Sequence, residues 1–202
     1  MPGADKYSAI LLLGGPGSGK GTQGVIIGQM PNLVHLAMGD IFRGIDPNAE
    51  IGKEFLSYST KGHLVPDELT IRVFRHHVEE KIRAGEIDPA YHTLVLDGIP
   101  RTVEQVKLLE GVAVVKRVVY LIMEDREALI ARLVGRAKKS DRPDDADRAV
   151  IENRIDVYER ETRPVVDAYN KKLLARVNAD QPPLAVLRDV AGCLVGYVSA
   201  SI

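Results

Sequence analysis

Short apolar runs and segments with helical spacing alternate along this chain of 202 residues. Such alternation is typical of a parallel sheet covered by helices, because each strand is followed by a helix that crosses back over the sheet. The pattern therefore predicts an α/β fold with about five parallel strands. The apolar runs that we assign to strands are residues 8–13, 33–36, 93–96, 117–123 and 174–177.

The clearest helical periodicity lies in residues 66–84, where apolar side chains recur three or four positions apart. Asp67 falls in the first turn of this helix, where a negative charge is favoured by the helix dipole. Two further helices are predicted over residues 125–138 and 146–169. Pro164 is expected to bend or interrupt the second of them.

Two segments fit the alternation poorly. Residues 45–61 follow the second strand, and residues 138–147 are almost wholly charged. We expect both to be excursions from the sheet that move on binding. The chain length corresponds to a single domain with such insertions.

Composition excludes several classes of function. Lys plus Arg number 27 and Asp plus Glu 28, so the net charge of −1 offers no basic surface for nucleic acid or an anionic membrane. The longest apolar run, residues 118–123, is far shorter than the ~20 residues of a membrane span. Residues 1–7 lack the apolar core of a secretory signal. We therefore expect a cytoplasmic protein with no nucleic-acid or membrane partner.

The glycine-rich segment directly after the first predicted strand carries the strongest chemical signal. Five of the 18 glycines lie in residues 14–21, followed by Thr22. Glycines let the backbone turn its N–H groups towards an anion, and the helix that follows adds its positive end. Strand, glycine loop and helix predict a phosphate-binding loop, with Lys20 reaching the outer phosphates of a nucleoside triphosphate.

A second candidate group stands where another strand ends. Asp97 follows the apolar run 93–96 and precedes Gly98. A carboxylate at the carboxyl end of a parallel strand, beside a phosphate-binding loop, suits Mg²⁺ held directly or through water. We therefore predict that Asp97 serves a magnesium ion that enters with the nucleotide.

The histidines and the cysteine indicate no further metal or nucleophile. The five histidines have no ligand spacing, and the single cysteine excludes a disulfide and a four-thiolate zinc site. Cys193 lies among apolar residues near the C-terminus and is expected to be a small core residue. No zinc site is predicted.

Three segments together carry a resemblance to a known family. Residues 14–23 include the Lys-Gly-Thr-Gln ending of the loop, residues 39–43 read Gly-Asp-Ile-Phe-Arg, and residues 97–102 read Asp-Gly-Ile-Pro-Arg-Thr. With these motifs in order, the chain resembles the adenylate kinase family of nucleoside monophosphate kinases over about residues 9–182.

The resemblance implies one P-loop kinase domain over residues 1–202, acting as a monomer. A mobile insertion at about 38–67 would bind the monophosphate, and a short lid would span about 137–147.

The resemblance also implies roles for individual residues. The ATP site would be formed by Gly15, Gly17, Ser18, Gly19, Lys20, Gly21, Thr22, Arg132, Arg136 and Gln181. The AMP site would be formed by Met38, Arg43, His63, Leu64, Val65, Gly98, Arg101, Gln105, Arg142 and Arg154. Catalysis would fall to Lys20, Arg101, Arg136, Arg142 and Arg154.

The activity implied is reversible phosphoryl transfer from MgATP to AMP, giving two ADP. Gln105 matches the glutamine that reads adenine in the family, whereas Met38 stands where family members carry Thr, Ser or Ala. A pyrimidine monophosphate kinase of the same fold is the nearest alternative. A nucleotide-binding module without turnover is a second one, against which the arginines argue.

Overall fold

The computed structural model describes residues 6–137 and 147–197. Its centre is a five-stranded sheet in the order β2-β3-β1-β4-β5, in which every neighbouring pair is parallel. This confirms the predicted α/β fold. The strands are β1 (Tyr7–Gly14), β2 (Leu33–Ala37), β3 (Thr93–Asp97), β4 (Ala113–Ile122) and β5 (Leu174–Asn178).

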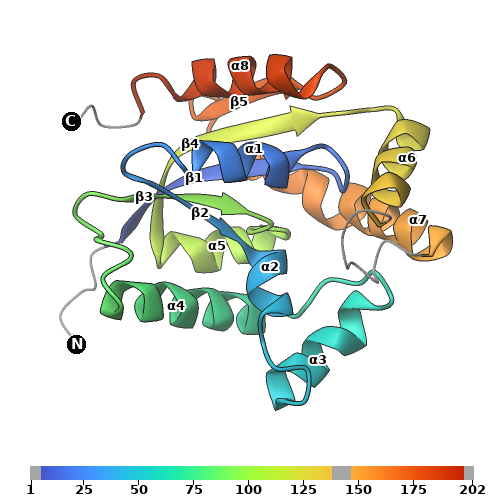
Figure 1. Ribbon diagram of the computed structural model, residues 1–202, viewed down its shortest axis with the longest axis horizontal. Helices are drawn as coiled ribbons and strands as arrows, with labels where there is room; N and C mark the ends of the chain where they lie inside the picture. The colour runs from blue at the N-terminus through green and yellow to red at the C-terminus, as the bar shows by residue number, and fades with distance from the viewer. Residues whose placement is uncertain (1–5, 138–146, 198–202) are drawn as a thin grey trace.

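Helices cover both faces of the sheet (Figure 1). Helices α1 (Lys20–Ile27) and α8 (Pro183–Leu194) lie on one face, and α4 (Asp67–Arg83) and α5 (Val103–Glu110) lie on the other. Ile10 and Leu12 of β1 pack into the core on the α1–α8 side, while Leu11 packs on the α4–α5 side. Because both faces are buried, the strand is a continuous apolar run without polar alternation.

The segment between β2 and α4 projects from the sheet. It holds α2 (Met38–Arg43) and α3 (Glu50–Ser59), and Figure 1 shows α3 as the helix farthest from the strands. The rings of Phe42 and Phe55 stack with centroids 4.9 Å apart and join the two helices. The expected excursion at 45–61 is therefore built around a helix, α3.

The predicted interruption of the helix over 146–169 at Pro164 is confirmed, but the regular α-helix ends earlier, at Val157. Helix α6 (Arg126–Ala137) is followed, after the undescribed residues 138–146, by α7 (Arg148–Val157). The chain then widens into a π-helical turn, η2 (Tyr158–Thr162), and tightens into a 3-10 helix, η3 (Arg163–Ala168). Pro164 has no N–H with which to continue the α-helical hydrogen bonds. The N–H of the preceding residue, Arg163, donates to the carbonyl of Tyr158, five residues back, which is the hydrogen bond of a π-helix.

Strand β4 begins four residues earlier than its apolar run predicts. Its first residues pair with β1 although the Val114 side chain is exposed, and the register with β1 shifts between Ala9 and Ile10. The first three residues, 113–115, are apolar too, but the charged Lys116 and Arg117 separate them from the run that follows, so the apolar run alone underestimates this strand. None of the helices in the described ranges has the length and apolar character that a membrane crossing requires.

Candidate active site

The carboxyl ends of β1, β2 and β3 meet at one edge of the sheet, where parallel sheets place their ligand sites. A cavity of about 1160 Å³ opens there. It brings together nearly all the residues selected from the sequence: Gly17, Ser18, Gly19, Lys20, Gly21, Thr22, Met38, Arg43, His63, Leu64, Val65, Asp97, Gly98, Arg101, Gln105, Arg132, Arg136, Arg154 and Gln181. Gly15 lies beneath this lining, and Arg142 falls outside the described residues.

The glycine loop runs from the end of β1 to the start of α1, as the sequence predicts. Gly17 and Gly19 have φ values of 82° and 96°, a backbone region that side chains rarely adopt. The Lys20 amine folds into the loop and donates to the carbonyl oxygens of Gly14 at 2.7 Å and Gly15 at 3.0 Å. The carbonyl oxygens at the start of the loop thus hold the amine at its end.

Positive charge converges on Lys20. Burial, together with the charges of Arg101, Arg136 and Arg154, lowers the pKa of its amine to about 8, and the charge of Asp97 opposes this shift. Three arginines from distant parts of the chain therefore act on one amine. Such a concentration of cations in one cavity is suited to a polyanion.

Asp97, the last residue of β3, is the acidic group of the site. Its Oδ2 lies 3.9 Å from Nε2 of His35, whose pKa is lowered by burial against the opposing pull of Asp97 and Asp40. The buried Ser18 hydroxyl has no hydrogen-bond partner in the described part of the chain. The same part contains no cluster of three or more His, Cys, Asp or Glu side chains arranged to hold a metal. One carboxylate with hydroxyls suits Mg²⁺, which keeps most of its ligands as water and substrate phosphates.

Two arginines that line the cavity lie directly on glycines. Arg101 Nε donates to the Gly98 carbonyl at 2.9 Å, and a Cβ on Gly98 would lie 2.9 Å from the Arg101 guanidinium. Arg43 is held in the same way over Gly39 and bonds to Asp40. Both strand ends therefore present a guanidinium fork to the cavity, a shape suited to a phosphate.

Comparison with known proteins points to one family. The family model described as adenylate kinase matches residues 12–174. The adenylate kinase of Kocuria rhizophila is 38% identical over 175 residues, which cover 84% of this chain and 89% of the relative. That of a Cyanothece species is 36% identical over 188 residues, covering 90% and 92% respectively.

The chain belongs to the adenylate kinase family. This confirms the resemblance drawn from the three motifs and does not favour the pyrimidine kinase alternative. The protein is accordingly a nucleoside monophosphate kinase, a phosphotransferase.

Two further residues that the sequence selects are held by specific contacts. Arg132 Nη1 donates to the Ala179 carbonyl at 3.1 Å, and the Gln181 amide donates to the Asn178 carbonyl and to Asp189. These contacts fix Arg132 and Gln181 at the rim beyond the glycine loop. Gln105 is buried deep in the other half of the cavity.

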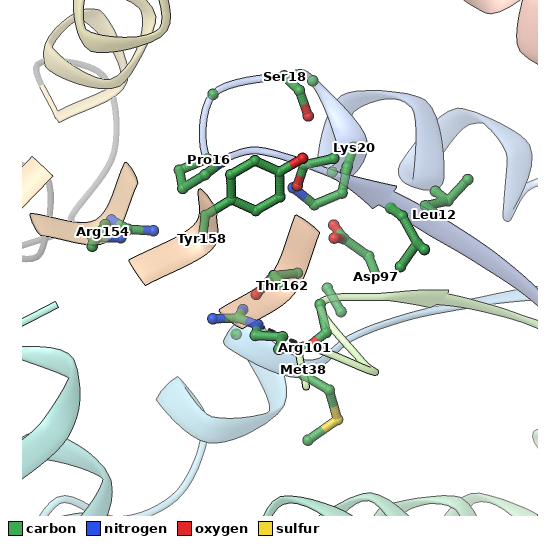
Figure 2. Close-up of a pocket in the computed structure, with 18 of the residues that line it drawn as sticks. Leu12, Pro16, Ser18, Lys20, Met38, Asp97, Arg101, Arg154, Tyr158 and Thr162 are labelled. Atoms are coloured by element: carbon green, nitrogen blue, oxygen red, sulfur yellow. Dashed lines mark hydrogen bonds between the residues drawn. The ribbon is translucent and has the colours of Figure 1, made fainter. Parts of the chain in front are cut away.

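Sequence reasoning missed two side chains that line the cavity, Tyr158 and Thr162. Figure 2 shows the Tyr158 ring beside Pro16 and Lys20, across from Asp97. A Cβ on Gly15 would lie 3.3 Å from this ring, so Tyr158 covers the loop, and its hydroxyl lies 3.1 Å from that of Tyr120. Both missed residues follow Arg154 at four-residue steps, but the second step lies in the π-helical turn, where the regular spacing of an α-helix no longer holds.

Proposed function

We propose that this protein transfers the γ-phosphoryl group of ATP reversibly to AMP, giving two ADP. The observation that carries the proposal is the convergence of Lys20, Arg101, Arg136 and Arg154 on one cavity, between a glycine loop and the buried amide of Gln105. A triphosphate at the loop and a monophosphate near Gln105 would bring their phosphates together among these cations.

On the ATP side, the backbone of Gly15–Thr22 would surround the phosphates, with Lys20 on the outer ones. Arg132 and Gln181 would border the adenine, since their side chains are anchored at the rim of the cavity. Arg136 and the lid residue Arg142 would neutralise the group in transfer.

On the AMP side, Arg43 and Arg101 would grip the phosphate with their guanidinium forks. The residues that shape the nucleoside pocket would be Met38, His63, Leu64, Val65 and Gly98, with Gln105 reading the base. Arg154 would face the transferred group from α7.

The chemistry requires no general base, because the AMP phosphate is anionic at neutral pH and can attack directly. The protein must align donor and acceptor, neutralise charge and exclude water, whose attack on ATP is the competing reaction. Mg²⁺, held by Asp97 and the ATP phosphates, would supply further positive charge. Closure of the insertion at about 38–67 and the lid at about 137–147 would exclude the water.

A coupled assay of ADP formation tests the proposal. With MgATP, AMP should be used at least about tenfold better than CMP or UMP in kcat/KM, because a smaller base leaves the Gln105 amide partly unpaired. Lys20→Met should lower turnover about 10²–10³-fold, the scale of losing one preorganised donor. Comparable kcat/KM for UMP and AMP would contradict AMP as the acceptor, and near-native turnover of folded Lys20→Met would contradict the role of the loop.

A further inference from the structure

The amide of Gln105 has two partners of opposite kind within the protein. Its Oε1 accepts a hydrogen bond from the Arg101 backbone N–H at 2.7 Å, and its Nε2 donates to Oδ1 of Asp67 at 2.9 Å. Gln105 is 1% exposed and lines the cavity, whereas Asp67 does not reach the cavity and lies behind Gln105. Any influence of Asp67 on a ligand must therefore pass through Gln105.

These two partners determine which way the amide points. A backbone N–H can only donate and a carboxylate can only accept. If the Gln105 amide rotated by half a turn, its NH₂ would face the Arg101 N–H and its oxygen would face the Asp67 carboxylate. Both contacts would then be repulsive, so the contacts from both sides select one orientation.

The orientation decides what Gln105 can offer to a base. After its internal contacts, Oε1 retains one lone pair and Nε2 retains one N–H. This pair complements a base edge on which an amino donor adjoins a ring-nitrogen acceptor, as in adenine. A base with a keto oxygen beside a ring N–H, as in hypoxanthine, presents the reverse pattern and would be matched only by the rotated amide.

We propose that Asp67 is a specificity-determining positioning residue, which fixes the polarity of the Gln105 amide so that the site accepts amino bases and rejects keto bases. This inference rests on the proposed function, because it requires the monophosphate's base to meet Gln105. Asp67 is also the first residue of α4, where its charge favours the helix. A purely structural role at that position predicts no change in base preference, so base preference separates the two roles.

The test compares AMP with IMP, which differ only in that donor and acceptor are exchanged on this edge. Asp67→Asn keeps the size of the side chain but can either accept or donate, so it relaxes the polarity. We expect the ratio of AMP to IMP in kcat/KM, and in dissociation constants from competitive displacement, to fall about three- to tenfold, the equivalent of one ordinary hydrogen bond. Glu68→Gln is the matched control, since it removes an exposed charge from the same helix end, and it should leave the ratio unchanged.

Both ratios are independent of how much of a variant is folded, because the same sample is measured with both ligands. The displacement ratio also needs no turnover. A ratio for Asp67→Asn within twofold of the unmodified protein would overturn the role of Asp67, and so would an equal fall in Glu68→Gln. Absence of AMP-dependent ADP formation in the unmodified protein would instead contradict the proposed function.

Discussion

Raising the pH from 7 to 9 should weaken nucleotide binding through one group, the Lys20 amine. Burial and three arginines lower its pKa to about 8 in the free protein, so the amine is about 90% charged at pH 7 and about 10% at pH 9. Bound phosphates favour the charged form and return the pKa towards its ordinary value. Affinity for ATP should therefore fall about tenfold between these pH values, and binding at pH 8 should take up about half a proton.

Titration calorimetry at pH 8, in two buffers of different ionisation enthalpy, measures this proton uptake directly. Lys20→Arg is the control, because its guanidinium keeps the charge throughout this range and has no proton to gain. The reasoning is refuted if the unmodified protein and Lys20→Arg take up the same number of protons. The lowered pKa of Lys20 also affects stability. The protein should become more stable as the pH rises above about 8, because the unfolded chain then holds more protons at Lys20 than the folded protein does. Lys20→Met should lack that increase.

Three further sets of substitutions, each with its own comparison, test contacts of the cavity residues Arg101, Gly98 and Tyr158. Arg101→Lys keeps the charge but loses the planar guanidinium fork. Turnover and AMP affinity should therefore fall strongly in steady-state kinetics, while ATP affinity changes little. A loss of ATP affinity with AMP affinity unchanged would show that Arg101 does not bind the AMP phosphate. Gly98→Ala and Gly85→Ala both introduce a side chain at positive φ, and each should cost about 1–2 kcal/mol in denaturant unfolding. Only Gly98→Ala should also raise the KM for AMP, because a Cβ at Gly85 meets open space and one at Gly98 meets Arg101; equal KM values would contradict this. Tyr158→Phe and Tyr120→Phe should each lower stability by about 1 kcal/mol, and the double variant should cost little more than either alone, since both remove one hydrogen bond; fully additive losses would show that the two hydroxyls act separately.

The sheet and the phosphate-binding half of the site were predictable from local sequence. Strands buried on both faces are continuous apolar runs, and the loop after β1 needs its glycines and Lys20 within a few positions. Asp97 was found in the same way, as the residue that ends an apolar run. In each case the functional residues lie at the end of the strand that positions them or directly after it.

Contacts between distant segments were not predictable in this way. Asp67 and Gln105 are 38 positions apart along the chain. The sequence pattern indicates only one role for Asp67, as an acidic residue in the first turn of its helix. Tyr158 stands in a π-helical turn, whose widened geometry depends on the proline that follows and on packing against the glycine loop. Helical periodicity describes a regular helix, so it cannot locate the residue at which the helix changes its pitch.

Three cations that line the cavity have hydrogen-bond partners within the protein. Lys20 bonds to two loop carbonyls, Arg43 to Asp40, and Arg101 to the carbonyl of Gly98. A nucleotide that binds here exchanges these partners for its own oxygens, so its net gain is smaller than the number of new contacts suggests. When it leaves, these three cations can return to the same acceptors in the protein. An enzyme that runs its reaction in both directions must release each product as readily as it binds each substrate, and internal partners of this kind ease that release.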